Sequence, residues 1–231
     1  MDPNYRELLI AFCRSDPLCS DKPARDLTQE EARDLVAHFI AKSQLSIGRP
    51  LQFDEKSRRV SSPRAGERVF LQPPMIGGVS YIIVNSNTGL PFRMQPRVGA
   101  LDLRFLVLLQ RLAVMLKQDW GTTQIYHGGL GAGGGQCHKD GRAIDFYGAQ
   151  TSSGQFMVKR DWGDAPVPAG GSASYRLAGG ANSAARMFFK DGWDFAEREA
   201  RPGGFICHPD HPNPTLRKSH QNHLHFQIGT T

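Results

Sequence analysis

The sequence predicts an α+β fold: a small, mainly antiparallel sheet with flanking helices, preceded by a helical N-terminal region. Two helical patterns, at residues 101–120 and 181–198, alternate with short segments of strand type at 79–84 and 224–228. No internal repeat is present in the sequence. At 231 residues, the chain is long enough for one large domain with a small helical appendage.

The N-terminal region has a helical pattern from Tyr5 to about Leu45. Within it, Thr28 and Glu31 have the spacing of a capping box, in which each side chain accepts a hydrogen bond from the backbone N–H of the other residue. Apolar positions follow at Leu35, Val36, Phe39 and Ile40. We therefore expect a helix to begin at this motif.

The stretch from residue 48 to residue 100 is rich in Pro, Gly and Arg around the single clear strand at 79–84. This composition is typical of loops and of the edge of a sheet. A link between two parts of the chain is expected here. We therefore assign residues 1–70 to the helical N-terminal region and its linker, and residues 71–231 to the main domain.

The main domain contains a well-defined helical pattern at 101–120, where apolar residues recur at the spacing of a helix packed on a core. Gly129, Gly131 and Gly134 match a dinucleotide-binding fingerprint, but that motif must open a helix, and here a strand follows. We interpret these glycines as the flexible rim of a cleft. The other expected elements are a β-type segment at 122–126, a glycine-rich loop at 128–135, a mobile segment at 151–180, a helix at 181–198 and a strand at 224–228.

Composition and charge exclude some classes of protein. No stretch approaches the roughly 20 apolar residues that a membrane-spanning helix needs, so membrane insertion is not expected. The chain has 28 Lys and Arg residues against 22 Asp and Glu residues, and its net charge of +6 favours a polyanionic environment. This excess is spread along the chain, and the densest basic run, at 56–59, contains no aromatic residue. Nucleic acid is therefore not an expected partner.

Histidine placement is the most informative feature of the sequence. Five of the eight histidines fall within eighteen residues near the C-terminus: His208, His211, His220, His223 and His225. Side chains two residues apart on a strand point to the same side, so His223 and His225 can address one site together. His208 and His211 lie among prolines, where we expect a solvated loop.

His138 and Asp145 form a second group of polar residues. Gly141 permits a turn between them, and the next residues have the pattern of a short strand in which Ile144 and Phe146 face the core. A turn and a strand of this length can bring His138 and Asp145 to a common point. With a histidine of the C-terminal pair, they would supply two nitrogens and one carboxylate. That is the ligand pattern of a catalytic zinc ion, which keeps its fourth position open for water.

These two clusters resemble the motifs of a known group of enzymes. The motif is His138-x2-Gly141-x-Ala143-x-Asp145 followed by His223-x-His225. It is similar to that of the LAS-type zinc peptidases, named for lysostaphin, D-Ala-D-Ala peptidases and sonic hedgehog. The tail from Ser219 to Phe226, with its His-x2-His-x-His spacing, most resembles the penicillin-insensitive murein endopeptidases. The resemblance covers roughly residues 100–231, and residues 1–70 carry no part of it.

The resemblance implies a role for each of five residues. The zinc ligands would be His138, Asp145 and His225. His220 and His223 would act beside the metal, in its second shell or in proton transfer. We expect His223 to accept the proton of the attacking water and His220 to orient it or to stabilise the oxyanion.

One departure concerns the D-Ala-D-Ala dipeptidase branch, which has a glutamate base three residues before its last ligand. Here His220 stands three residues before His223, and Asn222 stands three residues before His225. That branch therefore fits less well than the murein endopeptidases. A register in which His223 is the ligand stays open.

The expected function is hydrolysis of amide bonds in peptidoglycan stem-peptide cross-links, as in murein D,D-endopeptidases. The alternatives are a D,D-carboxypeptidase that holds a terminal carboxylate with Arg142 or Lys139, a metal-dependent nuclease, and a non-catalytic zinc-binding module. The acidic start at Asp2 lacks the basic n-region of a signal peptide. Action in the periplasm or cell wall would then require delivery by a secretion system or a phage lysis apparatus. A secreted antibacterial effector would also need an immunity protein in the producing cell.

Four cysteines, Cys13, Cys19, Cys137 and Cys207, allow three complete pairings. Both unpaired thiols and disulfides stay open, including a bond from Cys137 to Cys207. Adjacent side chains on an extended segment point to opposite sides, so Cys137 is not expected to bind the same metal as His138. Of the remaining histidines, His127 could line the cleft or be structural, and His38 is expected to have no functional role.

Overall fold

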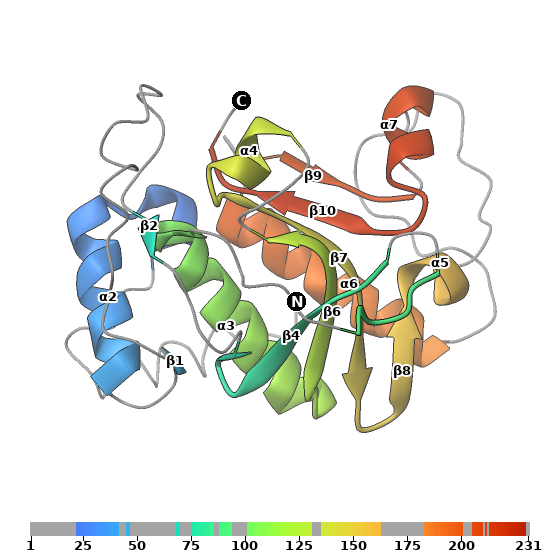
Figure 1. The fold of residues 1–231 in the computed structure, drawn as a ribbon, viewed down its shortest axis with the longest axis horizontal. Helices are drawn as coiled ribbons and strands as arrows, with labels where there is room; N and C mark the ends of the chain where they lie inside the picture. Colours follow the sequence, from blue (N-terminus) through green and yellow to red (C-terminus); the bar gives the residue numbers. More distant parts are fainter. Residues whose placement is uncertain are drawn as a thin grey trace.

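The structure is a computed structural model that describes residues 22–41, 45–46, 68–69, 75–85, 88–93, 101–130, 135–162, 183–200, 205–209, 211 and 213–229. Its fold is α+β, as predicted, and is built on a mixed sheet of eight strands (Figure 1). The strand order is β1 (Leu45–Ser46), β3 (Met75–Ile76), β4 (Val79–Ile83), β6 (Gln124–Leu130), β7 (Ala143–Thr151), β10 (Leu224–Gln227) and β9 (Phe205–Cys207), with β8 (Gly154–Met157) also paired to β7.

Most of the described strand pairs in this sheet are antiparallel, as expected. The exception is the parallel pair of β4 and β6, between which the chain crosses over through α3 (Leu103–Trp120). The sheet is larger than predicted, because the sequence patterns did not indicate β1, β3, β8 or β9. A separate pair is formed by β2 (Arg68–Val69) and β5 (Leu101–Asp102).

Helices cover one face of the sheet. On that face α3 packs against α6 (Ser183–Ala200), and α2 (Gln29–Ala41) packs along α3 (Figure 1). The shorter helices are η1 (Ala24–Asp26), α4 (Gln136–Lys139), α5 (Val158–Asp161) and α7 (Pro214–Ser219). In the described part of the chain, no helix has the length and apolar character needed to cross a membrane.

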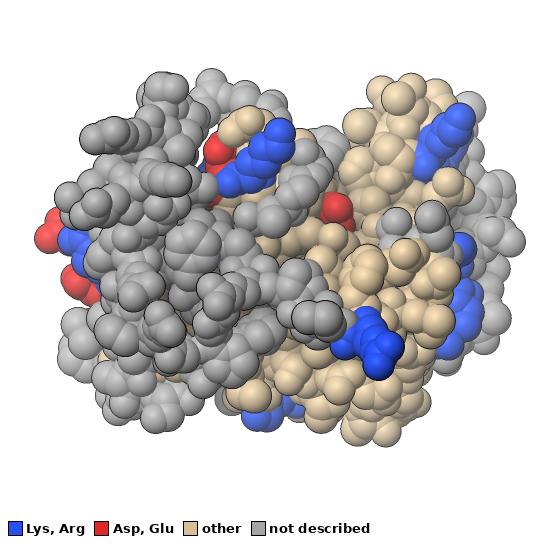
Figure 2. Space-filling view, in the orientation of Figure 1, with Lys and Arg blue, Asp and Glu red and all other residues tan. Residues whose placement is uncertain are grey.

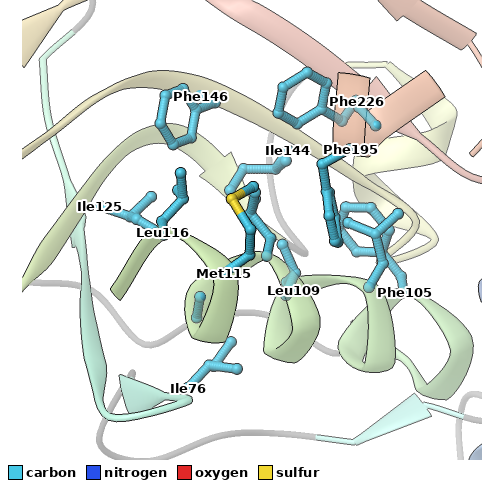
Figure 3. Close-up of a cluster of buried hydrophobic side chains, with 14 of the residues drawn as sticks. Ile76, Phe105, Leu109, Met115, Leu116, Ile125, Ile144, Phe146, Phe195 and Phe226 are labelled. Carbon is cyan, nitrogen blue, oxygen red and sulfur yellow. The ribbon is translucent and has the colours of Figure 1, made fainter. Parts of the chain in front are cut away.

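The hydrophobic core lies between α3 and the covered face of the sheet (Figure 3). Leu109 of α3, Ile144 of β7 and Phe226 of β10 are all buried there. Full burial of a side chain of this size contributes about 1.5–3 kcal/mol. Because side chains alternate along a strand, the burial of Ile144 and Phe226 turns their neighbours Asp145 and His225 to the opposite face.

The capping box at Thr28 and Glu31 is confirmed. Thr28 Oγ1 accepts a hydrogen bond from Glu31 N at 3.1 Å, and Glu31 Oε2 accepts one from Thr28 N at 2.8 Å. These bonds satisfy backbone N–H groups that have no partner within the first turn of α2. Residues 1–21, which contain the start of the helical pattern expected from Tyr5, lie outside the described chain.

The N-terminal helix shares its core with the sheet. Leu35 and Phe39 of α2 belong to the same buried cluster as α3 and the strands. The buried carboxylate of Glu199, on α6, accepts from Ala24 N at 2.9 Å and pairs with Arg111 Nη1 of α3 at 2.9 Å. The domain boundary predicted at residue 70 falls outside the described residues and stays a prediction.

The helix expected at 101–120 begins two residues later than predicted. Leu101 and Asp102 form β5, and the Asp102 carboxylate caps α3 by accepting from Arg104 N at 2.9 Å. The predicted end of α3 at Trp120 is confirmed. Gly121 closes the helix there in the left-handed conformation, with a φ of 59°.

The glycine-rich loop expected from residue 128 is in part a strand. β6 continues to Leu130, four residues beyond the predicted end of the β-type segment at 122–126. Gly128 allows close approach between neighbouring strands, because a Cβ at this position would lie 2.2 Å from Tyr147 Cε2. The prediction of a loop from residue 128 failed because the sequence does not distinguish a glycine required for close packing from a glycine in a flexible loop.

The mobile segment predicted at 151–180 is wrong in its first part. β8 forms a hairpin with β7, and α5 follows it directly. The turn is stabilised by Thr151 Oγ1, which donates to Gly154 O at 2.8 Å, and Phe156 is buried in the core. Residues 163–182 lie outside the described chain. The helix predicted at 181–198 and the strands predicted at 79–84 and 224–228 are confirmed as α6, β4 and β10, within two residues at each end.

Candidate metal centre

The candidate site lies on the face of the sheet opposite α3, where β7 and β10 run antiparallel. In their register His225 pairs with Asp145, and the next pair in the register, Phe226 and Ile144, lies in the core. Residues directly opposite each other on antiparallel strands share a face. The strand register therefore brings together two of the predicted ligands that are eighty positions apart in the sequence.

Three imidazoles converge on one carboxylate oxygen. Asp145 Oδ1 lies 2.9 Å from His225 Nδ1, 3.3 Å from His138 Nε2 and 3.4 Å from His223 Nε2. The histidine side chains are at most 10% exposed, whereas that of Asp145 is 22% exposed. The carboxylate is therefore enclosed by imidazoles and still accessible to solvent.

Asp145 is ionised at neutral pH. Burial raises the pKa of its carboxyl group, but hydrogen bonds from His138, His223 and His225 together have a larger effect in the opposite direction. The pKa of Asp145 is therefore held well below its usual range. An ionised carboxylate among imidazole nitrogens supplies the charge that a bound cation needs.

His138 reaches this point from α4, a single helical turn before β7. The sequence predicted an extended segment here, but the hydrogen bonds from His138 N to Gly135 O, at 3.1 Å, and from Asp140 N to Gln136 O, at 2.8 Å, close a helical turn. Gly141 then adopts a φ of 70°, which confirms the predicted turn and leads the chain into β7.

Cys137 is a buried thiol, so the disulfide to Cys207 that the sequence left open is not formed in this structure. Its sulfur lies 3.8 Å from Arg142 Nη2. It belongs to neither of the candidate metal-binding groups among the described residues. The side chains of Cys13, Cys19 and Cys207 lie outside the described part of the chain.

His220 is presented by α7, a short helix that the sequence patterns did not predict. Asn213 caps this helix by accepting from Thr215 N at 2.9 Å, and Pro214 occupies its first turn. At the C-terminal end, His220 Nδ1 lies 2.7 Å from Leu216 O. The backbone carbonyl can only accept, so Nδ1 carries the proton and Nε2 is the unprotonated nitrogen of the neutral ring.

The His220 ring closes one side of the site. Its centroid lies 4.9 Å from that of His223 and 5.6 Å from that of His225. Desolvation, together with the neighbouring imidazoles, lowers the pKa of His220, although the bond to Leu216 O opposes this shift. The neutral form of His220 is therefore favoured near pH 7.

Among the described residues, two groups of three His and Asp residues have ligand atoms within 4.8 Å of one another. The first is His138, Asp145 and His225, which is the predicted set, and the second is His220, His223 and His225. The first group fits a metal by its chemistry, because it combines an ionised carboxylate with two imidazoles directed at the same point. Imidazole binds several transition metals, so the described geometry supports a metal ion without fixing its identity.

The other histidines lie apart from these groups. His127 is buried beside Tyr81, with ring centroids 6.3 Å apart, and burial lowers the pKa of His127 to about 4. His38 is buried within α2. The solvated loop predicted around His208 is wrong for that residue, because its ring is buried between Trp162 and Trp193, at centroid distances of 5.7 Å and 4.7 Å.

Arg142 was predicted from the sequence as a residue that could bind a substrate carboxylate, but it forms an ion pair within the protein. Its guanidinium is 3% exposed and pairs with the buried carboxylate of Asp140 at 3.0 Å. It also contacts Ile228 O at 3.4 Å. Lys139, the other cation considered, is exposed.

Three residues around the site were missed by the sequence patterns. Asn222 Oδ1 lies 2.8 Å from His223 Nδ1, the Tyr147 ring lies 5.2 Å from the His223 ring, and Gln227 Oε1 lies 3.1 Å from His225 Nε2. Tyr147 and Gln227 each follow a predicted ligand by two positions on its strand. Period-two spacing was therefore the available signal, because such residues share the face of the ligand.

Figure 2 shows the molecule hollowed between the lobe that carries α7 and the part around α4, with an acidic side chain visible at the bottom of the hollow.

The chain matches no protein-family model, no curated protein and no solved structure. We therefore infer its function from the chemistry of the site residues.

Proposed function

We propose that this protein is a zinc-dependent peptidase that hydrolyses amide bonds in peptidoglycan stem-peptide cross-links, in the manner of a murein D,D-endopeptidase. The observation that carries the proposal is the convergence of His138 Nε2 and His225 Nδ1 on Asp145 Oδ1, at 3.3 Å and 2.9 Å, with two further histidines beside them. Two imidazoles and one carboxylate are the ligands of many catalytic zinc sites, and other side chains are then left for proton transfer.

His138, Asp145 and His225 would hold the metal. When bound, zinc lowers the pKa of a water molecule towards about 7 and polarises the carbonyl group of an amide. The protein must then supply a group that accepts the proton of the water and delivers it to the leaving amine.

His223 is suited to this proton transfer. Its Nδ1 lies 2.8 Å from Asn222 Oδ1, so with the amide oxygen towards the ring Nδ1 donates. With a metal ion bound to Asp145, Nε2 would be the accepting nitrogen of the neutral ring. Nε2 is directed towards the site, 3.4 Å from Asp145 Oδ1. The ring packs against Tyr147, which limits its rotation.

For His220, the hydrogen bonding argues against one of the expected roles, the stabilisation of an oxyanion. Because Nδ1 donates to Leu216 O, the neutral ring has no N–H left to stabilise an oxyanion. It can accept a proton through Nε2, next to His223. We therefore assign His220 to proton transfer with His223.

The substrate class is supported by the resemblance of the His220-x2-His223-x-His225 tail to murein endopeptidases and by the net charge of +6, which suits an acidic wall polymer. For the carboxypeptidase alternative, the Arg142 guanidinium is buried against Asp140, which leaves the exposed Lys139 as the cation that would hold a terminal carboxylate. Action would take place in the periplasm or cell wall. We also propose that a secretion system or a phage lysis apparatus delivers the protein. In the case of a secretion system, the producing cell would need an immunity protein.

The test is a digestion of purified muropeptides followed by mass spectrometry. Cross-linked dimers should be converted to monomers by the zinc-loaded protein and not after treatment with a chelator, and added zinc should restore the activity. A β-lactam should have no effect, because no serine is acylated in this chemistry. If D-Ala is released from monomeric pentapeptides while the dimers stay intact, the carboxypeptidase alternative would be favoured. Zinc binding without any turnover would favour a non-catalytic zinc module, and cleavage of nucleic acid would favour a nuclease.

A further inference from the structure

Gln227 is a buried polar residue beside the candidate metal centre, with no role in the chemistry described above. It lies on β10 two positions after His225, so both side chains are on the site face of the sheet. It is 4% exposed, and its partner in the strand register is the small residue Ala143 of β7. A buried amide is costly unless its polar atoms are hydrogen-bonded, so its bonds are informative.

Both ends of the Gln227 amide have a partner. Nε2 donates to Gly229 O at 3.1 Å, and Oε1 lies 3.1 Å from His225 Nε2. A backbone carbonyl can only accept, so the NH2 group must face Gly229. The amide oxygen therefore faces His225, and a hydrogen bond at that contact requires a proton on His225 Nε2.

His225 thus lies between two acceptors. Gln227 Oε1 is next to one ring nitrogen, and Asp145 Oδ1 is 2.9 Å from the other, Nδ1. A neutral imidazole has a single N–H and can satisfy only one of them. If the proton is on Nε2, the lone pair of Nδ1 faces the carboxylate, and that arrangement is favourable when a cation lies between them.

We infer that Gln227 is a positioning residue, which holds the proton of His225 on Nε2 and so makes Nδ1 the metal-binding nitrogen. This inference rests on the metal centre of the proposed function. It assigns to Gln227 the role that carbonyl and carboxylate groups commonly have behind metal-binding histidines, where they fix the tautomer and the ring orientation.

The anchor of the amide, Gly229, is packed against Arg142. Gly229 has a φ of 70°, and a Cβ at this position would lie 2.7 Å from Arg142 Nη1. Ile228 N donates to Arg142 O at 3.0 Å, and Arg142 pairs with Asp140 next to the turn that carries His138. The same buried ion pair therefore supports the His138 segment and the carbonyl that orients Gln227.

The test compares wild-type protein with Gln227→Leu, which keeps the approximate side-chain volume and removes the amide. Nitrogen-15 NMR of labelled histidine reports which ring nitrogen carries the proton and which binds metal. In the zinc-loaded wild type, His225 Nε2 should be protonated, with zinc on Nδ1. In metal-free Gln227→Leu, the fraction of the Nδ1–H form that donates to Asp145 should be larger than in the metal-free wild type. Zinc affinity, measured by competition with a chromophoric chelator, should fall about 10 to 100-fold.

Gln150→Leu is the matched control, since Gln150 lies on β7 and donates from Nε2 to the neighbouring Thr151 O at 3.3 Å. It should change neither the His225 signals nor the zinc affinity. An unprotonated Nε2 in the zinc-loaded wild type would overturn the inference without requiring any variant to fold. Unchanged zinc affinity in a folded Gln227→Leu protein would also overturn it. Because these readouts do not use turnover, a protein that meets them and leaves muropeptides intact would refute only the proposed function.

Discussion

His225 and Asp145 lie directly opposite each other on β10 and β7, with His225 Nδ1 2.9 Å from Asp145 Oδ1. The pairs on either side of them in the register place Phe226 and Leu224 in the core. A slip of one residue would turn the apolar set to solvent and the two polar residues inward, so the hydrophobic pattern fixes the register. The site is therefore assembled by the same contacts that stabilise the sheet.

Asp145→Asn should lose the metal. The amide removes the single anionic ligand of the predicted set, and its NH2 group cannot accept from the surrounding histidines. Elemental analysis after dialysis should find about one zinc ion per wild-type chain and close to none in the variant. Zinc at about 100 times its Kd should also stabilise the wild type by roughly 2.7 kcal/mol, and the variant should show no such effect.

Asp34→Asn is the control for this change. Asp34 is an exposed residue of α2 and takes part in neither candidate ligand group. Its substitution should leave the zinc content and the stabilisation by zinc as in the wild type. A normal zinc content in Asp145→Asn would refute the ligand set that contains Asp145.

His223→Ala should keep the metal and lose most activity. The change removes the proposed proton acceptor, and general acid–base catalysis typically contributes about 10² to 10⁴-fold to the rate. The turnover of muropeptide dimers and the zinc content should be measured on the same preparation. His211→Ala, at a half-buried histidine outside both groups, should affect neither quantity. Loss of zinc in His223→Ala would instead make His223 a ligand, as the second group allows.

The fold class could be predicted because its signals are local. The capping box at Thr28, the apolar spacing of α3 and the pattern of β10 each lie within one segment of the chain. The pairing of β7 with β10 links residues eighty positions apart and is not encoded in any single window. α7 has a helix-start signal in Asn213 and Pro214, but its six residues are too few to show a periodic pattern.

The candidate site was predictable to the extent that its residue types are uncommon. Histidines repeated at short spacing, with His138 and Asp145 upstream, are informative because metal ligands come from few residue types. Gln227 and Tyr147 are of types that occur on any sheet, so their period-two spacing from a ligand could place them on the site face but could not select them as part of the site. Burial and hydrogen-bond partners identify them, and those depend on the tertiary fold.

Gly128→Ala should destabilise the protein and impair the site. A Cβ at this position would lie 2.2 Å from Tyr147 Cε2, so the ring must move, and overpacking of this kind typically costs about 1–3 kcal/mol. Because the Tyr147 ring lies 5.2 Å from that of His223, its displacement should also lower turnover. Urea unfolding and the muropeptide assay measure the two effects.

Gly192→Ala provides the matched comparison. Gly192 lies within α6, and a Cβ there would meet nothing within 4 Å. The substitution should stabilise the protein by about 0.5–1 kcal/mol, because alanine is favoured over glycine inside a helix. Equal effects of the two glycine substitutions would show that the contact with Tyr147 does not constrain residue 128.

The stability of the protein should decrease in mild acid because of His127. Burial lowers the pKa of His127 to about 4, whereas in the unfolded chain its pKa should lie near the ordinary histidine value of 6.5. As the pH falls below about 6.5, the unfolded state therefore takes up a proton before the folded state does. The contribution of this residue is fully present above pH 6.5 and is lost progressively towards pH 4. The difference between a pKa of about 4 in the folded state and 6.5 in the unfolded chain corresponds to about 3 kcal/mol in the free energy of unfolding.

His127→Leu should remove this part of the pH dependence. Leucine cannot be protonated, and it replaces a ring whose Nδ1 is buried with no hydrogen-bond partner among the described residues. The free energy of unfolding in urea should be measured for both proteins between pH 7 and pH 4.5, without zinc, so that the metal site contributes equally to each. The variant should lose less stability than the wild type as the pH falls, with the difference developing below about pH 6.5. Parallel curves for the two proteins would mean that His127 titrates in the folded state as it does in the unfolded chain.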